Sequence, residues 1–167
     1  GPVADLNIDT AQFNDNTCLF SGGAIFLNNG TPANAMFFNV TFDNNRAGDT
    51  GGAIYKNGNA TNVNFNRCQF SYDSCGNANS GGALTILGGS ITMDSTRIHH
   101  CWADVNGGGI YSQSPITLNA CLIDSNQANN GAGVYLEMAN TSTISNTTFL
   151  ENLALADGGG LYADNHQ

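Results

Sequence analysis

Apolar and polar residues alternate along several short stretches of this chain, with a period of two residues. Clear examples are VNFN at residues 63–66, ITMD at 91–94 and ITLN at 116–119. Side chains that alternate in this way lie on opposite faces of a β-strand. No stretch places apolar residues at the 3.6-residue spacing of an amphipathic helix. The pattern therefore predicts an all-β protein built from short strands.

A glycine-rich motif occurs six times, at intervals of 24 to 30 residues. In each copy three small residues, mostly glycine, precede an aliphatic residue. The copies are GGAIFL (22–27), GGAIYK (51–56), GGALTI (81–86), GGGIYS (107–112), GAGVYL (131–136) and GGGLYA (158–163). Repeats of this length are typical of solenoids and propellers. We expect the glycines where the chain turns tightly and a side chain would collide with the neighbouring repeat.

A second motif, FxxN, lies upstream of each glycine motif. Its copies are FNDN (13–16), FDNN (42–45), FSYD (70–73), IHHC (98–101), IDSN (123–126) and FLEN (149–152). Alignment on this motif gives columns of residues with similar size. One such column is Ile8, Phe37, Phe65, Met93, Leu118 and Ile144. Stacked parallel coils need columns of this kind, because like side chains then lie over like at roughly 4.8 Å.

These columns predict an all-β fold, a right-handed parallel β-helix of about six coils with three short strands per coil. A propeller blade would need about 40 residues, and a leucine-rich repeat would need LxxLxL spacing. Residues 1–167 are expected to form a single β-helix domain cut from a longer array of repeats. Gly1 and Pro2 are expected to be a remnant of protease cleavage. Open ends of such a stack should associate end to end.

The interleaved motifs, GGA followed by Ile, Leu or Val, and FxxN, resemble the repeats of the polymorphic outer membrane proteins of chlamydiae. The resemblance extends over roughly residues 6 to 163. It implies a β-helical module that is secreted or displayed on the cell surface and is used in adhesion. The third and fourth coils depart from it with FSYD and IHHC, and only three glycine motifs are strictly GGA.

Composition narrows the classes of partner. The net charge is −9, and the only fixed cations are Arg46, Lys56, Arg67 and Arg97. Such a chain is unsuited to nucleic acid or to an anionic membrane surface. No apolar run approaches the roughly 18 residues of a membrane-spanning helix, so no direct membrane insertion is expected. The apolar fraction of 41% is enough for a packed core.

Two further columns of aligned residues are candidates for a structural or a functional role. The last residue of each FxxN motif is expected to form a structural ladder whose amides bond from coil to coil. That ladder is Asn16, Asn45, Asp73, Cys101, Asn126 and Asn152. The residue after each aliphatic of the glycine motif should point outward. That aromatic column is Phe26, Tyr55, Thr85, Tyr111, Tyr135 and Tyr162.

An exposed aromatic column is a candidate platform for sugar rings or for a protein partner. The alternative is that the rings stack on one another and only stabilise the sheet. Loops at residues 28–34, 56–62 and 137–141 are a second candidate binding surface.

Candidate catalytic groups do not form a convincing constellation in the sequence. The best cluster is Arg67, Arg97 and Asp94, which a surface ion pair explains equally well. His99 and His100 are adjacent and should point to opposite sides of a strand. We therefore expect no catalytic residues and no enzyme activity.

Metal, cofactor and disulfide signals are weak as well. The five cysteines lack CxxC spacing, and the calcium-binding nonapeptide of some β-helices is absent, so neither a metal nor a cofactor is expected. Only Cys75 and Cys101 occupy adjacent coils in a way that would permit a disulfide.

The sequence thus predicts an extracellular or cell-surface module that binds a cell-surface glycan or protein. Neighbouring coils of a longer parent chain are expected as further contacts. The alternative is a structural stalk or self-assembling scaffold, and a carbohydrate-active enzyme is less favoured.

Overall fold

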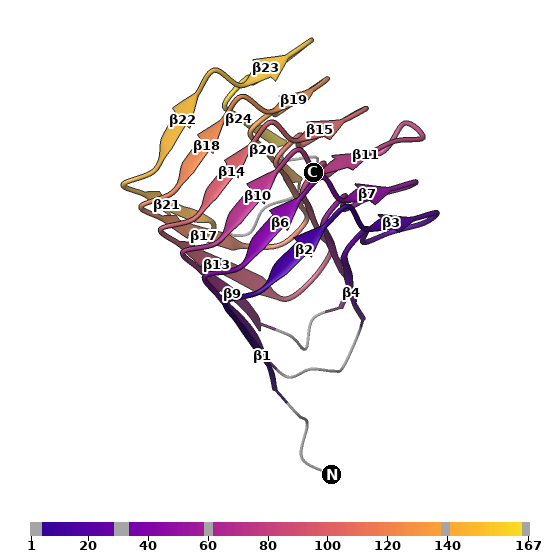
Figure 1. The fold of residues 1–167 in the computed structure, drawn as a ribbon. Helices are drawn as coiled ribbons and strands as arrows, with labels where there is room; N and C mark the ends of the chain where they lie inside the picture. The colour runs from indigo at the N-terminus through magenta and orange to yellow at the C-terminus, as the bar shows by residue number, and fades with distance from the viewer. Residues whose placement is uncertain (1–4, 29–33, 59–61, 138–140, 165–167) are drawn as a thin grey trace.

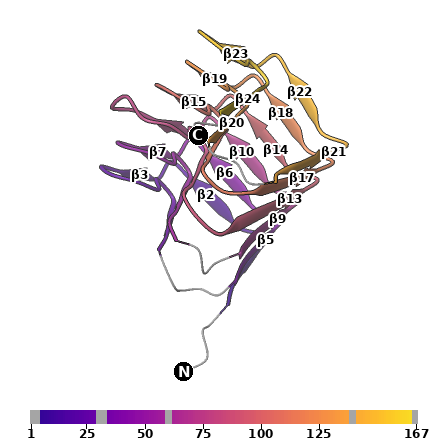
Figure 2. The same cartoon turned by 180° about the vertical axis from the view of Figure 1, so that it is seen from behind.

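A computed structural model describes residues 5–28, 34–58, 62–137 and 141–164. These residues form 24 strands and no helix, arranged in four parallel sheets of six strands each. Every coil contributes one strand to each sheet, so the chain makes five full turns between the first and sixth strands of a sheet. Figures 1 and 2 show the coils stacked in chain order, from the indigo strands at one end to the yellow strands at the other.

Each sheet collects every fourth strand. The first sheet contains β1 (Leu6–Asp9), β5 (Asn34–Phe38), β9 (Asn62–Asn66), β13 (Ser90–Asp94), β17 (Ile116–Asn119) and β21 (Thr143–Ser145). The second contains β2 (Gln12–Asn14), β6 (Thr41–Asp43), β10 (Gln69–Ser71), β14 (Arg97–His99), β18 (Leu122–Asp124) and β22 (Thr148–Leu150). The third contains β3 (Thr17–Cys18), β7 (Arg46–Ala47), β11 (Ser74–Cys75), β15 (Trp102–Ala103), β19 (Gln127–Ala128) and β23 (Leu153–Ala154). The fourth contains β4 (Ile25–Leu27), β8 (Ile54–Lys56), β12 (Leu84–Ile86), β16 (Ile110–Ser112), β20 (Val134–Glu137) and β24 (Leu161–Asp164).

The parallel β-helix is confirmed, and the strand register agrees with the columns read from the sequence. Phe37 pairs with Ile8 in the coil before and with Phe65 in the coil after. The expected three strands per coil are wrong, because each coil has four. The strands of the third sheet are two residues long, which is too short for an alternating pattern to be recognised.

The main core is filled by the inward-facing columns. In the second sheet Phe42 stacks between Phe13 and Phe70, with ring centroids 5.0 and 4.7 Å apart. Phe42 and Phe70 are fully buried. Stacking of identical rings at this spacing holds successive coils in register while it removes apolar surface from water.

A second, smaller core lies against the third sheet and contains only small side chains, Cys75, Ala103, Ala128 and Ala132. The glycine motif runs close to the third sheet here. A Cβ added to Gly52 would lie 2.0 Å from the carbonyl oxygen of Gly82 in the next coil and 2.5 Å from the backbone nitrogen of Ser74. The expectation that these glycines avoid a collision with the next coil therefore agrees with the structure.

Candidate functional site

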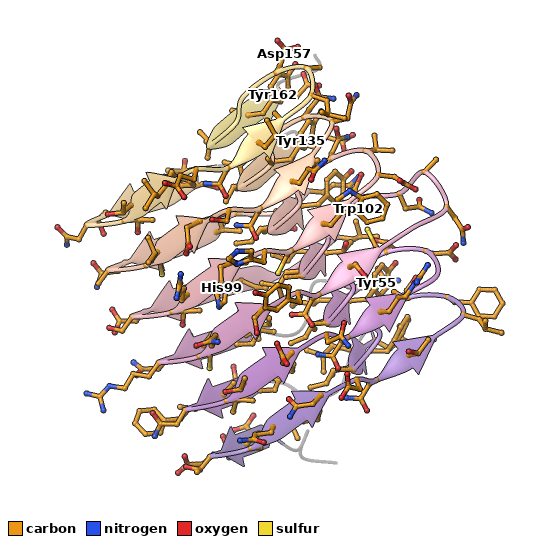
Figure 3. All side chains as sticks on the ribbon, turned by 45° about the horizontal axis from the view of Figure 1, so that its top comes forward. Tyr55, His99, Trp102, Tyr135, Asp157 and Tyr162 are labelled. Carbon is orange, nitrogen blue, oxygen red and sulfur yellow. The ribbon has the colours of Figure 1, made fainter. Side chains whose placement is uncertain are left out.

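The fourth sheet carries the aromatic column. Strand register aligns Phe26 with Tyr55, then Thr85, Tyr111, Tyr135 and Tyr162 in successive coils. Ring centroids lie 4.9 Å apart for Phe26 and Tyr55, 5.7 Å for Tyr111 and Tyr135, and 5.0 Å for Tyr135 and Tyr162. Figure 3 shows Tyr55, Tyr135 and Tyr162 at successive heights along the stack.

The column is less exposed than the sequence suggests. Phe26 is 52% exposed, but Tyr135 is only 6% exposed and Tyr55, Tyr111 and Tyr162 are half-buried. The turn that leads into each glycine motif packs against the column. A Cβ added to Gly131 would lie 2.9 Å from the Cβ of Tyr135. Tyr135 therefore serves the packing of the sheet and is not an open platform.

Hydrogen bonds fix two of the tyrosines. The Tyr111 hydroxyl donates to the Glu137 carboxylate and accepts a hydrogen bond of 3.0 Å from Nε2 of Gln113. The Tyr135 hydroxyl donates to Asp164 at 2.9 Å. Burial raises the pKa of both phenols, and the neighbouring carboxylates raise it further. Both rings are thus neutral and held in one orientation.

The ring stack is interrupted at Thr85. A cavity of about 200 Å³ lies at this position, and its lining residues are Thr50, Tyr55, Asn79, Ser80, Thr85, Leu87 and Tyr111. The hydroxyl groups of Thr50 and Thr85 lie within hydrogen-bonding distance of each other, and both approach the Ser80 carbonyl oxygen, at 2.7 and 2.9 Å. We call this cavity the Thr85 hollow.

The asparagine ladder connects the coils in two separate segments. The backbone N–H and Nδ2 of Asn45 donate to Oδ1 of Asp73, at 2.9 and 2.8 Å. The same two groups of Asn126 donate to Oδ1 of Asn152, both at 3.0 Å. Asn16 donates in the same way to Asn45. The backbone N–H of Cys101 likewise donates to Oδ1 of Asn126, at 2.9 Å. Cys101 has no side-chain amide, so the ladder is broken between Asp73 and Cys101.

A left-handed backbone conformation occurs one residue before each ladder position. The residues with positive φ at this place in the six coils are Asp15, Asn44, Tyr72, His100, Ser125 and Glu151. This turn directs the following ladder side chain inward, where its amide can reach the next coil.

Asp73 is the exceptional member of the ladder. Its side chain is fully buried, and Oδ2 has no hydrogen-bond partner among the described residues. Burial raises the pKa of Asp73 to about 7, against the opposing effect of the hydrogen bonds from Asn45. The carboxyl group occupies a position where four of the other five coils have an amide.

The second sheet carries a buried polar row that the sequence did not reveal. Register aligns Asp43, Ser71, His99 and Asp124 in four successive coils, and all except Asp43 are less than 9% exposed. The Ser71 hydroxyl donates to Asp43 at 2.5 Å. Nε2 of His99 has no hydrogen-bond partner among the described residues. The signal in the sequence was the residue directly after the first position of FxxN, which is polar in five of the six repeats.

The cluster of Arg67, Arg97 and Asp94 that the sequence suggested does not form. Arg97 does not join Asp94, because its Nε and Nη2 donate to the Asp124 carboxylate at 2.9 and 2.7 Å. This pairing lowers the pKa of Asp124. The guanidinium of Arg67 lies 5.7 Å from the ring centre of Phe38 instead.

His99 and His100 do not point apart. His100 follows the end of β14 and has a φ of 56°, so the chain turns there. The two Nδ1 atoms therefore lie 2.8 Å from each other. Burial lowers the pKa of His99.

Neither a disulfide nor a metal site is found in the part of the chain that the structure describes. Cys75 and Cys101 are free thiols, so the proposed disulfide is absent. Among the described residues no group of three or more His, Cys, Asp or Glu side chains could hold a metal ion. The same part of the chain has no helix that could cross a membrane. Much of the three candidate loops lies outside the described residues, namely residues 29–33, 59–61 and 138–140.

Comparison with known proteins agrees with this architecture. The family model described as "Right handed beta helix region" matches residues 23–167. The chain is 27% identical to the Probable outer membrane protein pmp20 of Chlamydia pneumoniae, in an alignment that covers 97% of this chain. The chain spans about a tenth of the length of that relative. No solved structure matches the chain. The resemblance to the polymorphic outer membrane proteins is confirmed, and the chain belongs to the right-handed β-helix family.

Proposed function

We propose that this chain is a binding module of a cell-surface protein, and that it captures a glycan or protein partner on the lateral face formed by the fourth sheet. The observation that carries the proposal is the Thr85 hollow, which opens beside two aromatic rings on an otherwise tightly stacked surface. Concave sites with aromatic walls and a few polar groups are the usual form of ligand sites. The name of the chlamydial relative, an outer membrane protein, supports a location at the cell surface.

A pair of variants tests this proposal. Glycan and extracellular-protein arrays are probed with the native chain, with the double variant Tyr55→Ala/Tyr111→Ala, and with Thr92→Ala/Thr117→Ala. The two threonines are exposed neighbours on the first sheet, so the third protein carries the same number of changes on another face. We expect capture by the native chain and by the threonine variant, and loss of capture by the tyrosine variant.

Circular dichroism and thermal melts establish that all three proteins are folded. Capture that persists in the folded tyrosine variant contradicts the assignment of the face. Absence of capture by the native chain on both arrays contradicts the binding role itself.

A second candidate function, a stalk built by stacking of coils, is supported by the sixth coil. Ile144 and Leu161 are 37% and 39% exposed, whereas their column neighbours Leu118 and Val134 are fully buried. Apolar columns exposed in this way favour the stacking of another coil. Sedimentation velocity over a range of concentrations tests this, because a stalk module should form elongated oligomers that Leu161→Lys weakens. A monomer at all concentrations would exclude this role for the isolated chain.

A further inference from the structure

The aromatic column has a gap of one ring. Stacked neighbours in the column lie 4.9 to 5.7 Å apart. Tyr55 and Tyr111 lie on either side of Thr85, two coils apart, which corresponds to roughly 9.5 Å in a parallel sheet. One ring inserted between them would therefore stack on both tyrosines at the spacing that the column already uses.

The walls of the gap are preorganised. Phe26 stacks on Tyr55 on the side away from the gap, and Tyr135 does the same for Tyr111. The hydrogen bonds of Tyr111 with Glu137 and Gln113 fix the tilt of that ring. A ligand would find both rings already in place, so little conformational entropy is lost on binding.

The floor of the gap is polar. It is formed by Thr85, which is 2% exposed, together with the hydroxyl of Thr50 and the carbonyl oxygen of Ser80. A pyranose ring with equatorial hydroxyl groups, as in glucose, has two faces composed largely of C–H groups and a rim of hydroxyl groups. It can stack on both tyrosines while its rim bonds to the floor. An aromatic side chain of a protein partner has no such rim, and it would form no hydrogen bond with the floor.

The electrostatic surroundings of the hollow favour neutral sugars over acidic ones. None of the residues that line the Thr85 hollow is ionisable near neutral pH, and the carboxylate of Glu137 lies beside one wall. The chain as a whole has a net charge of −9. An acidic sugar would meet no cation in the site and would be repelled by the protein, whereas a neutral sugar would not.

We infer that the Thr85 hollow binds one neutral hexopyranose residue of a glycan, inserted between the rings of Tyr55 and Tyr111. The inference rests on the proposed binding function and specifies its ligand class. The volume of about 200 Å³ suits one ring, since sites for larger ligands occupy about 300 to 1,000 Å³. Further sugars of the same glycan would lie on the surface outside the hollow.

The test uses methyl glycosides of glucose, galactose, mannose and N-acetylglucosamine as probes. Saturation-transfer NMR detects binding, and a titration followed by NMR measures the affinity. A single ring should bind with a dissociation constant on the order of 1 mM. Methyl glucuronide and N-acetyltyrosine amide serve as the acidic and the aromatic comparison probes.

The decisive variant is Thr85→Tyr, which places a ring in the gap and leaves both walls intact. It should weaken binding of the neutral glycoside by about tenfold or more. The matched control is Thr117→Tyr, which makes the same change at an exposed position of the first sheet, away from the gap, and should leave the affinity within about twofold. Thermal melts of both variants verify that they fold.

The possible outcomes separate the two proposals. Binding of a neutral glycoside that is lost only in Thr85→Tyr supports the inference. Unchanged binding in that variant, or binding of the glucuronide or the tyrosine amide alone, overturns it. Array capture that Thr85→Tyr retains but Tyr55→Ala/Tyr111→Ala abolishes would leave the proposed function intact while overturning the sugar site. Failure of every probe and of both arrays overturns both.

Discussion

Replacing Asp73 with asparagine should introduce the amide that four of the six coils carry in the ladder and should stabilise the protein most strongly at alkaline pH. Asp73 is fully buried, and its Oδ2 lacks a hydrogen-bond partner among the described residues. In the preceding coil Nδ2 of Asn45 donates to the carbonyl oxygen of Phe13 at 2.8 Å. The amide introduced by Asp73→Asn would occupy the equivalent position and could donate to the corresponding carbonyl of Phe42.

The magnitude follows from the pKa of Asp73, which burial raises from 3.8 to about 7. The folded state holds this proton more tightly than the unfolded state. The contribution of protonated Asp73 to stability is therefore fully present below pH 3.8 and is lost as the pH rises through about 7. A difference of about three pKa units corresponds to about 4 kcal/mol. The amide of the variant does not titrate, and its new hydrogen bond adds about 1 kcal/mol.

Urea denaturation at pH 4, 6 and 8, followed by circular dichroism, measures the difference in unfolding free energy between the two proteins. The advantage of Asp73→Asn should be about 3 to 4 kcal/mol larger at pH 8 than at pH 4. The matched control is Asn126→Asp, which introduces a carboxyl group at a paired position of the other ladder segment and should lose stability as the pH rises. If the difference for Asp73→Asn is the same at pH 4 and pH 8, the reasoning is refuted.

Three further substitutions test other parts of the structure, each by urea denaturation. Gly52→Ala should lower the free energy of unfolding by about 3 kcal/mol, because its Cβ would lie 2.0 Å from a carbonyl oxygen of the next coil. In the control Gly76→Ala the nearest atom to the new Cβ lies at 3.8 Å, so the free energy of unfolding should change by less than about 0.5 kcal/mol. Arg97→Gln should cost about 1 kcal/mol at pH 7, since Arg97 is 45% exposed, and the loss should vanish as the pH falls through the lowered pKa of Asp124. Phe70→Ala should cost about 3 to 5 kcal/mol, because the ring is fully buried; a loss below 1 kcal/mol would contradict the stacked core.

The sequence was sufficient to predict the register of the coils, because register in a β-helix is a property of aligned columns. Phe37 and Phe65, or Tyr111 and Tyr135, occupy equivalent positions in successive repeats, and the structure pairs them. The third sheet escaped detection because its two-residue strands have no periodicity of their own. Its column of small residues was visible, but the close approach of the glycine motif that requires them is a tertiary feature.

The sites depended more strongly on contacts between segments. Lys56 was expected in a loop, yet it is 1% exposed, and its Nζ donates to the carbonyl oxygens of Gly58 and Gly88. Burial lowers the pKa of Lys56 to about 8. Alternation alone does not show that Tyr135 is covered by a turn, nor that His100 turns back beside its neighbour. The identity of Thr85 was readable as a break in the aromatic column, but the cavity depends on the loop that carries Asn79 and Ser80.

The Thr85 hollow exists because one coil out of six has a small residue in a row of rings. In a lattice of equivalent positions, such a vacancy can be moved by exchanging two side chains. Thr85→Tyr combined with Tyr111→Thr should shift the vacancy along the solenoid axis by one strand spacing, about 4.8 Å. The backbone would keep its path, because each coil contacts only its immediate neighbours. Point substitutions can therefore change the position, the number and the spacing of the recesses on a β-helix of this kind, while its backbone stays the same.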